Sequence, residues 1–377
     1  MTLTRRPRLQ ALASTFLLAT ALACAPVRAD IVVGQTIGVT GQAAATVKEA
    51  LNGAQLWIEH INAQGGIKGE KIQLLTLDDE FDVQKAAANA RVLIEQKKAV
   101  VLFMNRGTPH TEAILPLLQQ HGIALVAPST GAMLLHNPVQ RYVFNVRAPY
   151  QREAEKAIEH LHSTGITRIA VVHVDDSFGR DAMEGASKGF AKTRLQPVAV
   201  LKADREKPAF DSLVPALVKA ETQAVLWVGS SQVVAGGVKA LRAAGSSAQV
   251  VTLSNNASAG FVKQLGDASR GVIVSQVFPG ERAVKYPFVQ EAQRLARAKG
   301  YDELTPAMLE GFAAAKVLAE ALRQAAPQFT REKVLAALEG LRKFDLGGLE
   351  ISYGPGDHSG LDFADLAIIG ADGRFVR

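Results

Sequence analysis

Three glycines at positions 65, 66 and 69 constrain the fold of this chain more than any other short segment. Residues 61–72 read Ile-Asn-Ala-Gln-Gly-Gly-Ile-Lys-Gly-Glu-Lys-Ile, with a helical pattern before them and a strand pattern after them. Gly65 and Gly66 suit a helix C-terminus, because glycine adopts positive φ without a steric penalty. A glycine-rich phosphate loop would need the reverse order, a strand first and then a helix. The segment therefore predicts a sharp reversal from a helix into a strand.

The same segment carries a resemblance to a known family. With Asn52-Gly53-Ala54 before it and Asp78-Asp79 after it, it resembles the signature of periplasmic solute-binding proteins of ABC transporters. The most similar type is the branched-chain amino-acid-binding (Leu/Ile/Val-binding) one, and the resemblance extends from Asp30 to about Arg377. It implies the type I periplasmic binding fold, an α/β fold of two Rossmann-like lobes with parallel central sheets and three interlobe crossovers.

The start of the chain has the pattern of an export signal. Three arginines precede the apolar stretch 9–23, and small residues at 27–29 suit cleavage by signal peptidase. We therefore expect a signal peptide over 1–29 and a mature periplasmic chain that begins at Asp30. A lipoprotein signal ending at Cys24 is the less favoured alternative, because no leucine stands three positions before that cysteine.

Composition argues against nucleic-acid and membrane-spanning functions. The formal net charge is +6, from 42 Lys+Arg and 36 Asp+Glu. Four of the arginines lie within residues 1–29, so 38 basic residues face 36 acidic ones in the mature chain, a net charge of +2. The basic residues form no runs, so no nucleic-acid partner is expected. No apolar run after residue 29 approaches the length of a membrane helix. We expect a soluble protein with two domains.

Strand and helix patterns alternate along the chain, as in parallel sheets covered by helices on both faces. The pattern predicts strands at 31–39, 71–77, 100–104, 124–126, 168–174, 224–228, 249–253 and 271–274, and helices at 44–62, 111–120, 286–299, 305–325 and 331–341. It runs once over 31–145 and again over 168–275, which predicts two similar lobes. The resemblance implies crossovers near 145–149, 277–280 and 353–360. The expected lobes are 30–147 plus 280–355, and 148–279 plus 356–377.

Ligands of open parallel α/β sheets bind at the carboxyl ends of the strands, where loops and helix N-termini expose N–H groups. This rule selects the loops at 40–43, 105–111, 128–131, 175–179, 230–231 and 254–256. In the second of these, Thr108 is expected to cap the next helix, with Pro109 as its first residue. Alternatively, the Thr108 hydroxyl and the neighbouring amides bind a ligand carboxylate, which the resemblance favours.

The residues predicted to contact the ligand are Gln42, Arg106, Gly107, Thr108, Ser129, Thr130, Gly131, Phe178, Ser231 and Asn255. The resemblance implies hydroxyl and main-chain contacts from the loop 128–131. It also implies that Phe178 presents its ring to the ligand, where related proteins often have a tyrosine.

One loop departs from the pattern of amino-acid binders. The resemblance implies a carboxylate at 254–256 to pair with an α-ammonium group, but this chain has Ser-Asn-Asn there. A buried ammonium group without an anionic partner is costly. Arg106 adds a cation that could clamp a carboxylate through two N–H groups, although it could also point to solvent. We therefore hypothesise a small aromatic or short aliphatic acid as ligand. A branched-chain-like amino acid is the alternative.

The sequence contains no motif that predicts catalysis. It lacks an H-E-x-x-H pair, and its G-x-S-x-G pattern at 185–189 does not directly follow a predicted strand, as a nucleophile elbow would. His160 and His162 are two residues apart and would face different directions on a helix, so no metal site is expected. We expect a monomeric, cofactor-free receptor, not an enzyme, that delivers its ligand to an ABC permease in the inner membrane. A receptor that serves a chemoreceptor or sensor kinase is the alternative.

Overall fold

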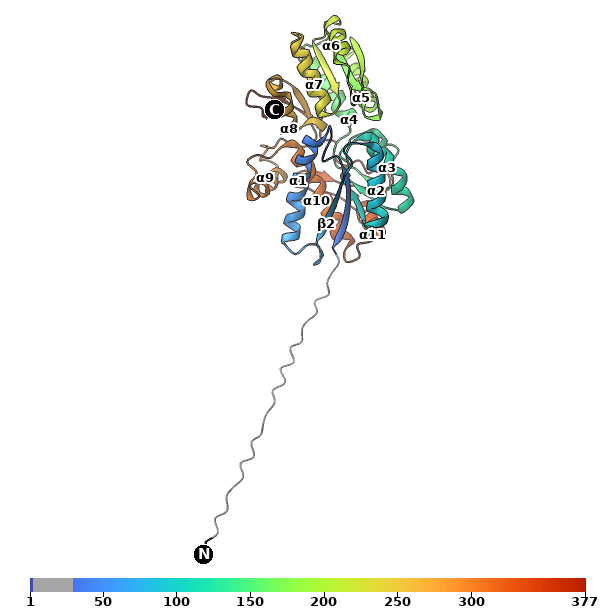
Figure 1. Ribbon diagram of the computed structural model, residues 1–377, viewed down its shortest axis with the longest axis vertical. Helices are drawn as coiled ribbons and strands as arrows, with labels where there is room; N and C mark the ends of the chain where they lie inside the picture. Colours follow the sequence, from blue (N-terminus) through green and yellow to red (C-terminus); the bar gives the residue numbers. More distant parts are fainter. Residues whose placement is uncertain (3–29) are drawn as a thin grey trace.

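The computed structural model describes residues 1–2 and 30–377, and the second range folds into two lobes (Figure 1). Apart from its first two residues, the expected signal peptide lies outside the described residues, and so does Cys24. Each lobe has a central sheet covered by helices, so the fold class is α/β as expected. None of the helices in the described part of the chain combines the length and the apolar character needed to span a membrane.

The first lobe contains a five-stranded sheet in the order β2-β1-β3-β4-β5, with every neighbouring pair parallel. Its strands are β1 (Ile31–Ile37), β2 (Ile72–Asp78), β3 (Val101–Phe103), β4 (Leu125–Val126) and β5 (Val143–Phe144). One face packs against α1 (Ala44–Ala63), α9 (Pro287–Ala298), α10 (Pro306–Ala325) and α11 (Arg331–Glu339). The other face packs against α2 (Val83–Arg91) and α3 (Thr108–His121). A short antiparallel pair, β11 (Phe344–Asp345) and β12 (Glu350–Ile351), follows α11.

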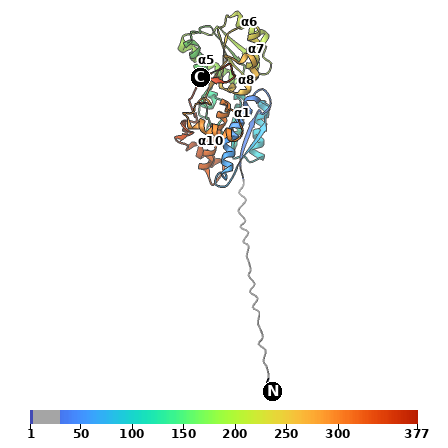
Figure 2. The same ribbon diagram turned by 90° about the vertical axis from the view of Figure 1, so that its left-hand side faces the viewer.

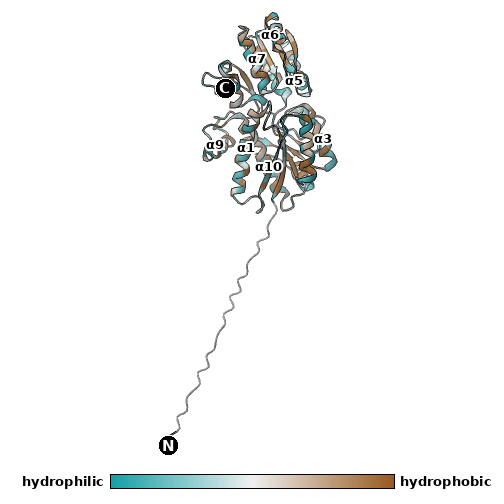
Figure 3. Ribbon diagram, in the orientation of Figure 1, coloured by the Kyte–Doolittle hydropathy of each residue, from teal (hydrophilic) through white to brown (hydrophobic). Residues whose placement is uncertain are grey.

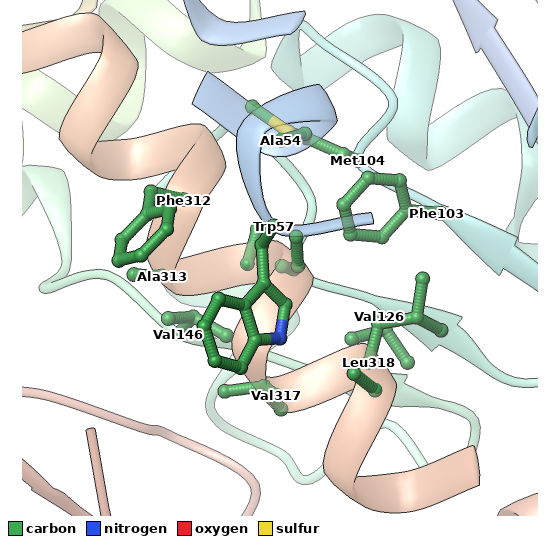
Figure 4. Packing of buried hydrophobic residues seen from close by; sticks show 14 of the residues in the cluster. Ala54, Trp57, Phe103, Met104, Val126, Val146, Phe312, Ala313, Val317 and Leu318 are labelled. Atoms are coloured by element: carbon green, nitrogen blue, oxygen red, sulfur yellow. The ribbon is translucent and has the colours of Figure 1, made fainter. Parts of the chain in front are cut away.

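Side-chain alternation along the strands builds both cores of this lobe. In β3, Val101 and Phe103 belong to the core under α1 and α10, whereas Leu102 belongs to the core under α2 and α3. Trp57 of α1 meets Phe312 of α10 edge to face, with ring centroids 5.5 Å apart (Figure 4). The sheet strands are largely apolar and the outer faces of the helices largely hydrophilic (Figure 3). The C-terminal helices are therefore an integral part of the first lobe.

The second lobe contains a seven-stranded sheet in the order β14-β13-β10-β9-β8-β6-β7. The parallel strands are β6 (Ile169–Val174), β7 (Ala199–Ala203), β8 (Ala224–Val228), β9 (Gln249–Thr252) and β10 (Ile273–Gln276). Two antiparallel strands, β13 (Asp365–Ile369) and β14 (Phe375–Val376), extend one edge. The helices of this lobe are α4 (Tyr150–Ser163), α5 (Ser177–Thr193), α6 (Phe210–Lys219), α7 (Ser231–Ala243) and α8 (Ala259–Leu265).

The chain passes three times between the cores of the two lobes. Ala148 packs in the first-lobe core and Tyr150 in a second-lobe core, so the first passage lies between them. The second passage lies just after β10, and the third lies between Leu361 and β13. Residues 356–361, which we assigned to the second lobe, pack on the first, because the His358 ring stacks on Phe144 with centroids 4.0 Å apart.

The glycine segment forms the reversal that the sequence predicts. Helix α1 ends at Ala63, and Gly65 and Gly66 follow with φ of 96° and 74°. The Gly66 N–H donates to the Ile61 carbonyl over 3.0 Å. A Cβ on Gly66 would lie 2.1 Å from the Glu70 carbonyl oxygen, so the turn excludes larger residues there. The reversal places β2 directly beside β1 in the sheet.

Candidate ligand-binding cleft

A narrow cavity of about 30 Å³ lies between the two lobes. Every residue that lines it comes from a loop or first helical turn that follows a parallel strand, as the strand-end rule predicts. The lobes touch directly around it, since Ser231 at the start of α7 donates a hydrogen bond to the Gln42 carbonyl over 3.1 Å. On α1, the Glu49 carboxylate accepts hydrogen bonds from the N–H groups of Ala259 and Gly260 in α8. Helices α1 and α8 lie side by side in both views (Figures 1 and 2). The two lobes are therefore closed on each other.

The structure brings seven of the ten predicted residues to the cavity wall: Arg106, Gly107, Thr108, Ser129, Phe178, Ser231 and Asn255. The other three lie just behind the wall. The Thr130 hydroxyl pairs with the Thr108 hydroxyl at 2.7 Å, and Gln42 accepts hydrogen bonds from Ser230 and Ser231. Gly131 packs against the first interlobe passage, where a Cβ would lie 2.6 Å from the Ala148 carbonyl oxygen.

The predicted N-cap of α3, Thr108, was wrong by one residue. Gly107 is the N-cap, with φ of 97°, and Thr108 is the first helical residue. A Cβ on Gly107 would lie 2.5 Å from Nδ1 of His110, so only glycine fits without displacing that ring. The Thr108 hydroxyl is consequently free of a capping role and reaches Thr130.

Arg106 is one of the two cations that line the cavity among the described residues. Its side chain is buried, with 5% of the residue exposed, so the alternative that it points to solvent is wrong. Its Nη1 donates to the Ser129 hydroxyl over 2.9 Å, and its Nη2 donates to the Asn255 carbonyl over 2.5 Å. The second of these bonds joins the first lobe to the second. Burial lowers the pKa of Arg106, and the nearby Glu310 carboxylate opposes that shift.

A buried chain of charged groups continues from Arg106 beneath the cavity. The Ser129 hydroxyl donates to Oε1 of Glu310 over 2.8 Å, and Nη1 of Arg147 lies 3.6 Å from the same oxygen. Arg147 also forms an ion pair with Glu153. Burial opposes the charged form of Arg147, but Tyr150 and the carboxylates of Glu153 and Glu310 outweigh it and raise the pKa of Arg147.

The network of buried charged groups ends at Glu153 in the second lobe. Glu153 accepts hydrogen bonds from the Ser254 N–H, over 2.9 Å, and from the Ser275 hydroxyl. Arg147 donates to the Ser254 hydroxyl over 2.5 Å. Because Glu310 belongs to α10 of the first lobe and Glu153 to α4 of the second, Arg147 holds one carboxylate from each lobe beside the first interlobe passage.

Aromatic rings form the apolar walls of the cavity. Tyr150 and Phe178 lie with centroids 4.7 Å apart, on the second lobe. Phe81, on the first lobe, lies under the Arg205 guanidinium at 5.3 Å, and Nε of Arg205 donates to Asp176 over 2.6 Å. The sequence did not single out Tyr150, Phe81 or Arg205 as cavity residues. Ala43 and Ser230, which also line the cavity, belong to loops that the sequence did select.

Among the described residues, no group of three or more His, Cys, Asp or Glu side chains could hold a metal ion. The acids near the cleft have other partners. Asp176 caps α5 by accepting from the Gly179 N–H over 3.0 Å, and it also pairs with Arg205.

The buried carboxyl group of Asp79, beside the cavity residue Phe81, makes the stability of the fold depend on pH. It is fully buried and accepts hydrogen bonds from the Thr36 hydroxyl and the Phe81 N–H. Burial raises its pKa to about 6, above the value in the unfolded chain. The protonated carboxyl therefore stabilises the fold below about pH 4, and this contribution is lost as the pH rises toward 6. As the pH rises from 4.5 to 7, the free energy of unfolding of Asp79→Asn should increase by roughly 2 kcal/mol relative to that of wild type. Urea unfolding at the two pH values measures this change.

Asp78→Asn is the matched control for this prediction. Burial opposes ionisation of Asp78, but hydrogen bonds from Thr40 and the Glu80 N–H lower its pKa below the ordinary aspartate value, the opposite direction to Asp79. Its difference from wild type should be the same at both pH values. A pH-independent difference for Asp79→Asn would contradict the assignment.

Comparisons with known proteins place this architecture in a family. The model of the family described as "Periplasmic binding protein" matches residues 30–373. The chain is 26% identical over 227 residues to the "Amino acid binding protein" of Pseudomonas aeruginosa, a match that spans 59% of this chain and 60% of that protein. It is 25% identical over 353 residues to the "Leu/Ile/Val-binding protein BraC3" of Rhizobium johnstonii, across 90% of this chain and 92% of that one.

A solved structure supports the same relationship. The substrate-binding periplasmic protein of Ralstonia solanacearum is 32% identical, with a TM-score of 0.83, and the match covers 92% of this chain and 99% of that one. The two lobes and their parallel sheets are those of the type I periplasmic binding fold. The chain belongs to the periplasmic binding protein family.

Proposed function

We propose that this protein is an extracytoplasmic receptor that binds a small carboxylate-bearing ligand between its lobes and delivers it to an ABC permease. The observation that carries the proposal is Arg106, a cation buried in an interlobe cavity and bonded to both lobes. A buried guanidinium stabilises a carboxylate strongly, because two parallel N–H groups match the two carboxylate oxygens. The relatives that are named for amino acids support a carboxylate-bearing ligand, because amino acids also bear a carboxylate.

The closed, ligand-bound conformation would be the form that the ABC permease recognises. The lobes meet through contacts such as Ser231 with Gln42 and Glu49 with Gly260, and these must separate before a ligand enters. A ligand shifts the balance between open and closed states only by its difference in affinity for them. Contacts from both lobes, such as Arg106 and Phe178, supply that difference. We propose a monomer that acts without catalysis in the periplasm.

The proposal is tested by recovering the ligand. The full mature chain is purified without added ligand, denatured, and the released small molecules are identified by mass spectrometry. We expect a carboxylate-bearing compound in a ratio near one per chain, and its re-addition should raise the melting temperature of refolded protein.

Two variants make this test specific. Arg106→Met should carry at least tenfold less of the compound, whereas Arg141→Met, an exposed arginine outside the cavity, should carry as much as wild type. If no small molecule is released and none from a broad metabolite panel changes the melting temperature, the receptor function is wrong.

A further inference from the structure

We infer that the cavity selects carboxylates that lack an ammonium group, with Arg106 as the residue that determines this specificity. The inference rests on the proposed receptor function and narrows its ligand class. It follows from the hydrogen-bonding groups and charges around the cavity, most of which already have partners within the protein.

The hydroxyl groups of the cavity give a ligand ammonium group little to bind. Ser129 donates its single proton to Glu310 and accepts from Arg106. Ser230 donates to Oε1 of Gln42 over 3.0 Å, and Ser231 donates to the Gln42 carbonyl. The oxygens of Ser230 and Ser231 can still accept hydrogen bonds, but a neutral hydroxyl supplies no negative charge to pair with an ammonium group. The charged group that can still bind a ligand is the Arg106 guanidinium.

No acidic side chain is present in the described cavity wall, and each of the nearby acids already has a cationic group beside it. Asp176 pairs with Arg205. Glu310 accepts from Ser129 and lies 3.6 Å from the Arg147 guanidinium, while Glu153 pairs with Arg147 directly. An ammonium group in the cavity would therefore lose its hydration without gaining an anionic partner, which strongly disfavours its binding.

The main-chain acceptor offered by the second lobe is also occupied by a cation. The Asn255 carbonyl accepts from Nη2 of Arg106 over 2.5 Å. An ammonium group that took this acceptor would sit beside the guanidinium, and two like charges at that separation repel. A carboxylate meets the opposite situation. Arg106 uses two of the five N–H groups of a guanidinium, and opening the lobes releases the one held by Asn255.

The rest of the wall suits an apolar body of the ligand. Phe81, Tyr150 and Phe178 supply rings from both lobes, and Ala43 adds a small apolar surface. A carboxylate on Arg106 with an aromatic or branched hydrocarbon tail among these rings satisfies the charge and buries apolar surface. The ligand class is thus a small monocarboxylate with such a tail.

Two matched pairs of compounds test the class by calorimetry on the full mature chain freed of bound ligand by unfolding and refolding. They are 4-methylpentanoate with leucine, and 3-phenylpropanoate with phenylalanine, and each pair differs only by the α-ammonium group. We expect at least one acid to bind, with an affinity at least 100-fold above its amino acid. An amino acid that binds as tightly as its acid, or failure of both acids to bind, overturns the inference.

Variants separate specificity from folding. In Arg106→Met, the affinity for the acid should fall at least 100-fold and lose its advantage over the amino acid, so the ratio of the two collapses. Arg106→Lys keeps the charge without the planar fork and should give an intermediate ratio. The melting temperature of each variant should stay within a few degrees of wild type. An unchanged ratio in Arg106→Met contradicts the role of Arg106.

Failure of this inference can be told apart from failure of the receptor function. If leucine or phenylalanine binds tightly, or if the compound recovered from purified protein carries an ammonium group, the ligand class is wrong while the receptor function stands. If no compound is recovered and none binds, both are wrong.

Discussion

Arg147→Met should lower the free energy of unfolding by about 3–5 kcal/mol, because it removes the cation shared by two buried carboxylates. Arg147 is 1% exposed, and Glu153 is fully buried. Without the guanidinium, Glu153 would keep only its hydrogen bonds from Ser254 and Ser275. Glu310 would keep only the one from Ser129. A charge left in this environment without a partner costs more than the intact pair contributes.

The measurement is urea unfolding followed by circular dichroism at pH 7, analysed for both the midpoint and the slope. Arg152→Met is the control, because Arg152 lies nearby in sequence but is exposed and meets Asp362 at 3.8 Å. Exposed pairs of this kind contribute at most about 1 kcal/mol. The double variant Arg147→Met with Glu153→Gln should recover part of the loss, since it also removes the stranded charge. A loss in Arg147→Met no larger than in Arg152→Met would show that the buried network does not hold the lobes together.

Local patterns sufficed to predict most of the cavity. The strands β3, β4, β6, β8 and β9 were each foreseen, and the strand-end rule then selected the loops that follow them. Seven predicted residues line the cavity for this reason. Two of the cavity residues that the sequence did not predict share a local cause. Tyr150 follows β5 and Arg205 follows β7, and neither strand was predicted: β5 has two residues, and β7 is an edge strand with one buried residue.

The charged network could not be predicted, because its partners are distant in the sequence. Ser129 and Glu310 are 181 residues apart, and Glu310 sits in an otherwise alanine-rich helix with no local motif. Only the packing of α10 beside the first-lobe sheet brings it beneath the cavity. The missing acid at 254–256 was visible in the sequence, whereas the acids that replace it in the charge balance belong to α4 and α10.

Gly311→Ala should destabilise the protein by roughly 2–3 kcal/mol, although alanine is the better helix former by about 1 kcal/mol. Gly311 lies within α10, where a Cβ would fall 1.8 Å from the Ala50 carbonyl oxygen of α1. On the facing helix, a Cβ on Gly53 would fall 1.9 Å from the Met308 carbonyl oxygen. Both contacts are with main-chain atoms, so no rotamer change can relieve them and the helices would have to separate. Urea unfolding at pH 7 measures the loss.

Gly340→Ala is the control for replacing a glycine that makes no close contact with another helix. Gly340 follows α11 with a φ of −85°, and the nearest atom to a Cβ there is 3.1 Å away, so the change should be within about 0.5 kcal/mol of neutral. Separation of α1 from α10 would also loosen the core around Trp57 and Phe312, so the tryptophan fluorescence of Gly311→Ala should shift to longer wavelength. If Gly311→Ala is as stable as Gly340→Ala, the close approach of these two helices is not what fixes their crossing. The glycine of the Asn52-Gly53-Ala54 motif would then need another explanation than this contact.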